Sequence, residues 1–86
     1  MNDDKFEWDQ ANIVHIAEHG LKPEEVEQAI ANNPITLTVV IRGGELRTIC
    51  AGRTDSRRVL KVIYTERRGR IRVVTAHEDR RLRRIL

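Results

Sequence analysis

Residues 34–53 read PITLTVVIRGGELRTICAGR, and their hydrophobic pattern is the clearest indication of the fold. After Pro34, apolar side chains recur at every second position through Ile41, which is the spacing of a β-strand with one buried face. The pair Gly43 and Gly44 is typical of a tight hairpin turn of two residues. The stretch therefore predicts two antiparallel strands, at residues 35–41 and 45–53.

The sequence after this hairpin predicts two more strands, at residues 58–66 and 70–76, because β-branched side chains are frequent in both. Short turns precede each of them: residues 54–56 read TDS and residues 67–69 read RRG. Parallel neighbours need crossovers of about a dozen residues or more, so turns this short indicate an antiparallel meander of four strands.

The sequence before the hairpin has helical spacing instead. One helix is expected at residues 9–19, where Asp9 can cap the first turn and Gly20 supplies the stop. A second helix is expected at residues 23–31, which begin with proline and two glutamates, the residue types that favour a helix N-terminus.

Two shorter features complete the predicted fold. Residues 6–8 can form a short edge strand, and a basic C-terminal helix is expected from about Glu78. The fold class is therefore α+β: two N-terminal helices packed on a four-stranded antiparallel meander, with a basic C-terminal helix. At this length, residues 1–86 are expected to form a single domain.

Charge is divided unevenly along the chain. Residues 1–33 carry eight acidic side chains against two lysines, whereas residues 42–86 carry 14 basic against five acidic side chains. Thirteen of the 16 basic residues are arginine, whose planar guanidinium matches phosphate better than lysine does. RNA is therefore the expected partner, and a solvated basic surface that the acidic half partly neutralises is the alternative.

Composition also excludes several classes of protein. No stretch approaches the roughly 18 apolar residues of a membrane span, and the acidic N-terminus does not resemble a signal peptide, so we expect a cytoplasmic protein. Cys50 is the only cysteine and lies in an apolar run, which indicates a buried, inert thiol. Three scattered histidines and one cysteine match no usual metal spacing, so neither a metal nor another cofactor is expected.

RNA cleavage by the 2′-hydroxyl needs a base, cations for the phosphate and an acid for the leaving oxygen. Glu45 is the candidate base. His77 is the candidate acid, because it lies where the last strand meets the terminal helix and histidine changes charge near neutral pH; a structural role in the turn is the alternative. His19 is interpreted as a packing or helix C-terminal residue, and His15 as solvated.

Alternation along the strands groups the arginines. Arg70 and Arg72 share one face of the last strand, and Glu45, Arg47 and Arg53 share one face of another. If the register aligns these faces, one side of the sheet is rich in arginine and can follow an RNA backbone. The alternative is that these charges only occupy the solvated face of a two-layer fold.

Several short motifs, spread in order over nearly the whole chain, are similar to one known family. They are Phe6-Glu7-Trp8-Asp9, His19-Gly20, Pro23-Glu24-Glu25-Val26-Glu27, Gly52-Arg53-Thr54, Arg58-Val59-Leu60 and Ile71-Arg72-Val73-Val74-Thr75-Ala76. Together these motifs resemble the BrnT family of toxins. The resemblance implies a ribonuclease toxin of a type II toxin–antitoxin system, with a fold similar to the RelE superfamily, that cleaves RNA and inhibits translation. It also implies a BrnA-like ribbon-helix-helix antitoxin, through which the toxin reaches DNA only indirectly.

The resemblance also implies site residues. Matches to the family's motifs are the Glu-x-Arg of Glu45 and Arg47, the Gly-Arg of Arg53, the strand-opening Arg58, and Arg72 of the last strand. The chain departs from the family at His77, where an arginine is usual, at Glu18, where a lysine or arginine is common, and at its end, which lacks the family's tyrosine.

These matches lead to one set of expected roles. Glu45 is expected to act as the base, Arg58 as the phosphate clamp and His77 as the acid. The expected RNA-binding residues are Arg47, Arg53, Arg72, Arg80 and Arg81.

Three functions fit these observations. The first is a metal-independent endoribonuclease. The second is a catalytically weak protein whose main role is to bind an antitoxin. The third, a plain RNA-binding module, is disfavoured because the chain has only Phe6, Trp8 and Tyr64 as aromatic side chains, and none lies among the arginines in sequence.

Overall fold

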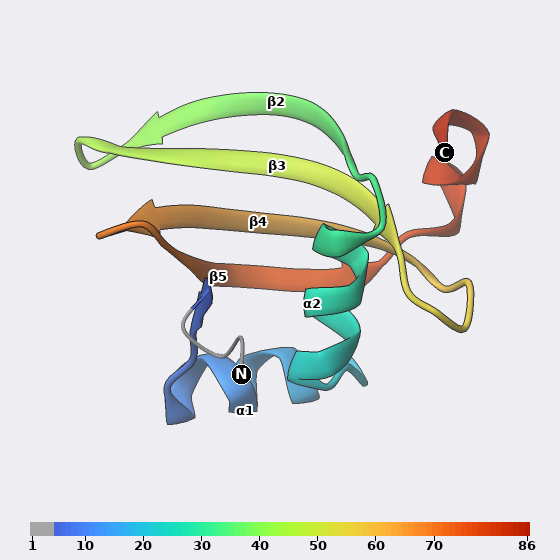
Figure 1. Ribbon diagram of the computed structural model, residues 1–86, viewed down its shortest axis with the longest axis horizontal. Helices are drawn as coiled ribbons and strands as arrows, with labels where there is room; N and C mark the ends of the chain where they lie inside the picture. Colours follow the sequence, from blue (N-terminus) through green and yellow to red (C-terminus); the bar gives the residue numbers. More distant parts are fainter. Residues whose placement is uncertain (1–4) are drawn as a thin grey trace.

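A single five-stranded sheet with two helices on one side forms the body of the protein in a computed structural model, which describes residues 5–86 (Figure 1). The strands lie in the order β1-β5-β4-β3-β2. The elements are β1 (Phe6–Glu7), α1 (Gln10–Ala17), α2 (Pro23–Ala31), β2 (Ile35–Arg42), β3 (Glu45–Arg53), β4 (Val59–Arg67), β5 (Arg70–Glu78) and the 3₁₀ helix η2 (Arg80–Ile85).

Strands β2 to β5 form the predicted antiparallel meander. The edge strand expected at residues 6–8 is present as β1, and it adds a fifth strand to the four of the meander. Strand β1 pairs in parallel with β5, with Phe6 opposite Ile71 and Glu7 opposite Arg72, so the sheet is mixed. The parallel pairing is possible because α1, α2 and the meander separate the two strands along the chain.

Both predicted helices are present, and local signals fix their starts. The Asp9 carboxylate accepts a hydrogen bond from the backbone N–H of Asn12, at 2.9 Å, which caps α1. At α2 the Glu25 carboxylate accepts the backbone N–H of Lys22, at 3.0 Å. Gly20 has a φ of +76° between the helices, a conformation that glycine adopts without strain.

The core lies between the helices and the sheet. Its largest fully buried members are Ile16 of α1, Val26 of α2 and the strand residues Leu60, Val62 and Val73. Helix α2 sits so close to β3 that a Cβ on Gly52 would collide with the backbone of Ala29. This glycine is therefore required by the contact between the two layers.

A bulge in β5 changes which side chains face the core. Ile63 pairs with Thr75 and Tyr64 pairs with Val73, so Val74 has no partner in the ladder. As a result Val73 and Ala76 are both buried, three positions apart. The strict alternation predicted for this strand does not continue through it.

The C-terminal segment is not the predicted α-helix. Residues 77 and 78 extend β5, because His77 pairs with Lys61 and Glu78 with Leu60, and the Asp79 N–H donates to the Val59 carbonyl at 2.9 Å. The 3₁₀ helix η2 begins only after Asp79. No helix described in residues 5–86 is long and apolar enough to span a membrane.

Strand β2 forms the far edge of the sheet, and each of its eight residues is exposed. Its apolar side chains reach solvent on both faces, and Ile41 is the most exposed at 72%. Neither lysine nor proline interrupts the strand, although edge strands often carry them.

Candidate functional site

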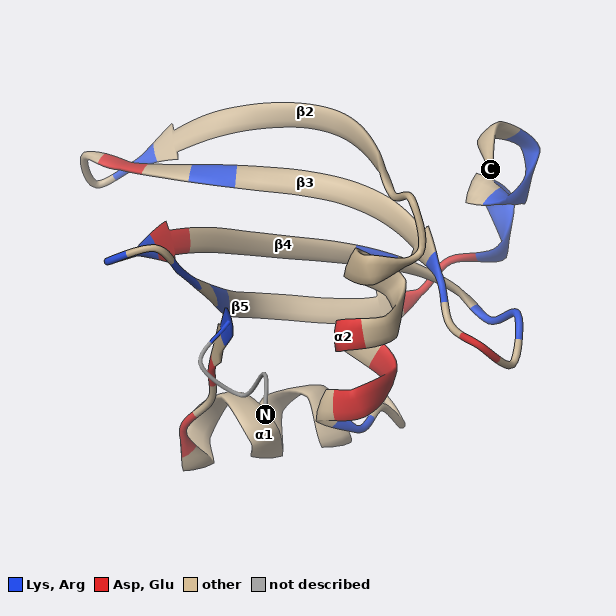
Figure 2. Cartoon of the chain, viewed as in Figure 1, with Lys and Arg blue, Asp and Glu red and all other residues tan. Residues whose placement is uncertain are grey.

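Basic residues gather at the two ends of the sheet, whereas the middle of the strands carries few charges (Figure 2). The sequence predicted one arginine-rich face. Successive turns of the meander lie at opposite ends of the sheet. The arginines near those turns therefore form two groups, one at each end, and not a single face. We call the end with Glu45, Arg47 and Arg67 the hairpin end, and the end with Arg58, Lys61 and His77 the histidine end.

Glu45 anchors the hairpin end. Its Oε2 accepts hydrogen bonds from Nε and Nη2 of Arg67, at 3.1 and 2.9 Å, and its Oε1 lies 3.4 Å from Nε of Arg47. The hydrogen bonds from Arg67 hold the pKa of Glu45 below its usual value. A carboxylate that two arginines keep ionised is a weak proton acceptor, so its geometry suits an ion pair better than a general base.

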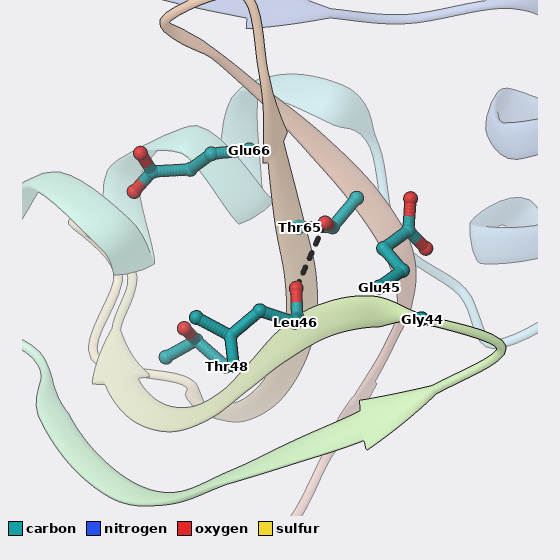
Figure 3. Close-up of a pocket in the computed structure, with 6 residues that line it drawn as sticks. All are labelled: Gly44, Glu45, Leu46, Thr48, Thr65 and Glu66. Atoms are coloured by element: carbon teal, nitrogen blue, oxygen red, sulfur yellow. Dashed lines mark hydrogen bonds between the residues drawn. The ribbon is translucent and has the colours of Figure 1, made fainter.

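A pocket of about 360 Å³ opens beside Glu45 (Figure 3). The ladder between β3 and β4 ends where Thr48 pairs with Tyr64, and the strands separate beyond that point. The Thr65 hydroxyl donates to the Leu46 carbonyl at 2.9 Å and bridges the gap. Glu45 and Glu66 both line this pocket, which therefore disfavours a phosphate inside it.

Arg58 organises the histidine end. Its Nη1 donates to the Glu25 carboxylate at 2.8 Å and to the Gly20 carbonyl at 3.4 Å, and its Nη2 donates to the Glu78 carboxylate at 3.1 Å. Burial alone would lower the pKa of Arg58, but the two carboxylates outweigh it and raise this pKa. The guanidinium thus ties α2 and the turn after α1 to the end of β5.

The three histidines of the chain form a row, in which His19 adjoins both His15 and His77. The ring centroids of His15 and His19 are 5.5 Å apart, and those of His19 and His77 are 6.1 Å apart. His15 also lies 3.0 Å from the Thr75 hydroxyl. Among residues 5–86, no group of three or more histidine, cysteine, aspartate or glutamate side chains is arranged to hold a metal ion.

Lys61 completes this end of the sheet. It is the register partner of His77 on the neighbouring strand β4, and partners in an antiparallel ladder project their side chains to the same face, roughly 5 Å apart. Within the described part of the chain, Lys61 makes no ion pair. The Lys61 amine therefore lies beside His77 with its N–H donors available to a ligand.

The remaining predicted RNA-binding residues are divided between the ends. Arg47 and Arg72 lie toward the hairpin end, and Arg72 donates to the Asp9 carboxylate at 2.9 Å. Arg53 is exposed at the histidine end. Arg80 and Arg81 lie in η2 and pair with Glu78 and Asp79, at 3.6 and 3.1 Å.

The chain was compared with known families, curated proteins and solved structures. A model of the BrnT family, described as the ribonuclease toxin of type II toxin–antitoxin systems, matches residues 8–82. This chain belongs to the BrnT family. No curated protein and no solved structure matches it. The family description entails an RNA substrate and an antitoxin partner for this BrnT toxin, and the RelE-like fold stays a prediction.

The structure does not assemble the three catalytic residues predicted for this BrnT toxin. Arg58 and His77 lie at the same end, because Arg58 donates a hydrogen bond to Glu78, the residue that follows His77. Glu45 accepts hydrogen bonds from Arg67 at the opposite end of β4, and the six residue steps from Lys61 to Arg67 span about 20 Å of strand. Glu45 is therefore too distant to act on a proton near His77.

Sequence reasoning missed two residues at this site. Lys61 lies in the interior of a predicted strand, where its pairing with His77 follows only from the register. His19 was interpreted as a packing or helix C-terminal residue. It does follow the C-cap of α1 directly, but it is exposed and adjoins His77. The available signal was the spacing of His15 and His19, which places both on one helix face.

Proposed function

We propose that this chain is a metal-independent endoribonuclease whose cleavage site is the histidine end of the sheet. The proposal is supported by the register pairing of His77 with Lys61, which sets an imidazole beside an amine that forms no ion pair within residues 5–86. Arg58 acts as a positioning residue, because its bonds to Glu25 and Glu78 fix the strand end that carries His77. Glu45 has no part in this chemistry.

The proposed reaction needs no external reactant other than RNA. The ribose 2′-oxygen gives its proton to a base and forms a bond to phosphorus, and the bond from phosphorus to the 5′-oxygen breaks. His77 donates a proton to that leaving oxygen, and Lys61 offsets the charge that builds up on the phosphate. The products are a 2′,3′-cyclic phosphate and a 5′-hydroxyl, so atoms and protons balance.

Cleavage of messenger RNA in the cytoplasm, and a block of translation as its result, form part of the same proposal. A toxin that cuts its host's RNA must be held inactive. We therefore propose a ribbon-helix-helix antitoxin of the BrnA type as the partner, with an acidic segment that competes with RNA for the basic residues. Contact with DNA would then come only through the antitoxin.

An RNA cleavage assay tests the proposed function. The purified chain is incubated with end-labelled single-stranded RNA in EDTA, and the chemical ends of the fragments are determined. We expect fragments that end in 2′,3′-cyclic phosphate and 5′-hydroxyl, and a loss of roughly 10²–10⁴-fold in rate for His77→Ala. Intact RNA, or cleavage that EDTA abolishes, would refute the proposal.

A further inference from the structure

The proposed reaction leaves one role unfilled, that of the group that removes the proton from the 2′-hydroxyl. Glu45 was expected to fill it but lies at the opposite end of the sheet. The group must reach the same phosphate as His77. It must also have a basic atom that is not already held in an ion pair, and the carboxylates of Glu25 and Glu78 both accept hydrogen bonds from Arg58.

His19 meets both requirements. Its ring centroid lies 6.1 Å from that of His77, and it comes from a different element, the turn after α1. A phosphate that accepts hydrogen bonds of about 2.8 Å on two sides fits between nitrogens that are roughly 5–7 Å apart. Ring nitrogens lie close to the ring centroids, so two imidazoles whose centroids are 6.1 Å apart can place nitrogens within this range and contact one phosphodiester.

We propose that His19 is a second catalytic residue, which takes the proton of the ribose 2′-hydroxyl while His77 supplies the proton of the leaving 5′-oxygen. This inference rests on the proposed ribonuclease function. One imidazole gains a proton and the other loses one, so the pair must exchange its protonation states before the next turnover. Solvent can carry this exchange because His19 is exposed.

Charged side chains surround the pair. Lys61 lies opposite His77, and Glu78 and Asp79 follow His77 in the chain and pair with arginines. His19 adjoins His15 and precedes Gly20, whose carbonyl Arg58 contacts. Titratable or charged groups around the pair are His15 and Glu18 on α1, Glu25 on α2, Arg58, Lys61 on β4, and Glu78 and Asp79 at the end of β5.

The test is a pH profile of single-turnover RNA cleavage in EDTA for the parent, His19→Ala and His77→Ala. We expect a bell-shaped profile for the parent, because one imidazole must be neutral and the other protonated. His19→Ala should lower the maximal rate by roughly 10²–10⁴-fold and remove the limb that rises with pH. His77→Ala should remove the limb that falls. RNA affinity should change less than about twofold in both, since neither loss removes a permanent charge.

A matched control separates catalysis from folding. His15→Gln replaces the neighbouring histidine with a side chain that can still bond the Thr75 hydroxyl, and it should cleave at nearly the parent rate. Thermal melting identifies any variant that fails to fold, and for such a variant His19→Asn takes the place of alanine. If the parent cleaves and folded His19 variants cleave equally fast, the inference is wrong while the ribonuclease function stands. A parent that leaves RNA intact overturns both.

Discussion

Gly52 of β3 lies directly against the backbone of Ala29 in α2, with no space for a side chain between them. Because the nearest atoms belong to a helix backbone, they cannot move aside as a flexible side chain would. Gly52→Ala should therefore lower the free energy of unfolding by about 1–3 kcal/mol or more, as overpacked cores do. Urea denaturation measures this value. Val14→Ala, at an exposed helix position, is the control and should change stability by less than about 0.5 kcal/mol.

Arg58 also contributes to stability, in a way that depends on pH. The backbone N–H of Lys22 and the guanidinium of Arg58 hold the pKa of Glu25 below its ordinary value of 4.5. A lowered carboxyl pKa stabilises the fold above the pKa of the unfolded chain, and this contribution is lost as the pH falls through the folded pKa.

Removal of Arg58 should weaken that pH dependence. We expect Arg58→Ala to lose about 1–2 kcal/mol at pH 7, because two hydrogen-bonded carboxylates are left without their cation. The difference from the parent should shrink toward pH 3. Urea unfolding at several pH values measures it, and an equal loss at pH 3 and pH 7 would contradict the ion-pair explanation.

Cys50 should react slowly with alkylating reagents. Burial in the core raises the pKa of its thiol to about 11, so almost none is thiolate at pH 8. Iodoacetamide labelling, followed by mass spectrometry, should proceed many times faster in urea than in native buffer. Equal rates in the two conditions would show that the thiol is accessible in the folded protein.

Replacement of Glu45 tests whether the hairpin end of the sheet takes part in cleavage or only in RNA binding. Glu45→Gln removes the carboxylate that neutralises Arg67 and Arg47, so these arginines become free to bind phosphate. We expect RNA affinity at low salt to rise a few-fold and the cleavage rate at saturating protein to stay within about twofold of the parent. Fluorescence anisotropy and single-turnover cleavage give the two values. A rate loss of roughly 10²-fold or more would return Glu45 to the catalytic site.

His77→Arg separates charge from proton transfer. Arginine keeps the positive charge but does not release its proton in proteins, so it cannot serve as the acid. The variant should therefore cleave as slowly as His77→Ala while it binds RNA at least as tightly as the parent. If it cleaves at the parent rate, a cation at this position is sufficient, and the proposed role of His77 as the acid is wrong.

The strands of the meander could be predicted from sequence because their signals are local. Alternation after Pro34 and the glycine turn at 43 and 44 depend only on neighbouring residues. The end of β5 could not be predicted in this way, because residues 77 and 78 continue the strand only through their pairing with β4. The bulge at Val74 likewise reflects the fit between two strands, and its residue type gives no sign of it.

The candidate site was predicted in part for a similar reason. Arg58 and His77 were named individually, but the residues that stand beside them, Lys61 and His19, are set by register and by the docking of α1. The predicted topology already implied that Glu45 lies far from Arg58. Successive turns of a meander lie at opposite ends, and Glu45 follows the first turn whereas Arg58 follows the second.

The exposed edge strand β2 and the basic ends of the sheet (Figure 2) should respond to salt in opposite directions. Sulfate and similar salts strengthen contacts between apolar surfaces, such as those that Val39 and Ile41 leave open to solvent. The same increase in ionic strength weakens the binding of arginine and lysine side chains to phosphate. A rise in salt should therefore release bound RNA and favour self-association of the free chain, and light scattering recorded during an RNA titration would follow both events in a single sample.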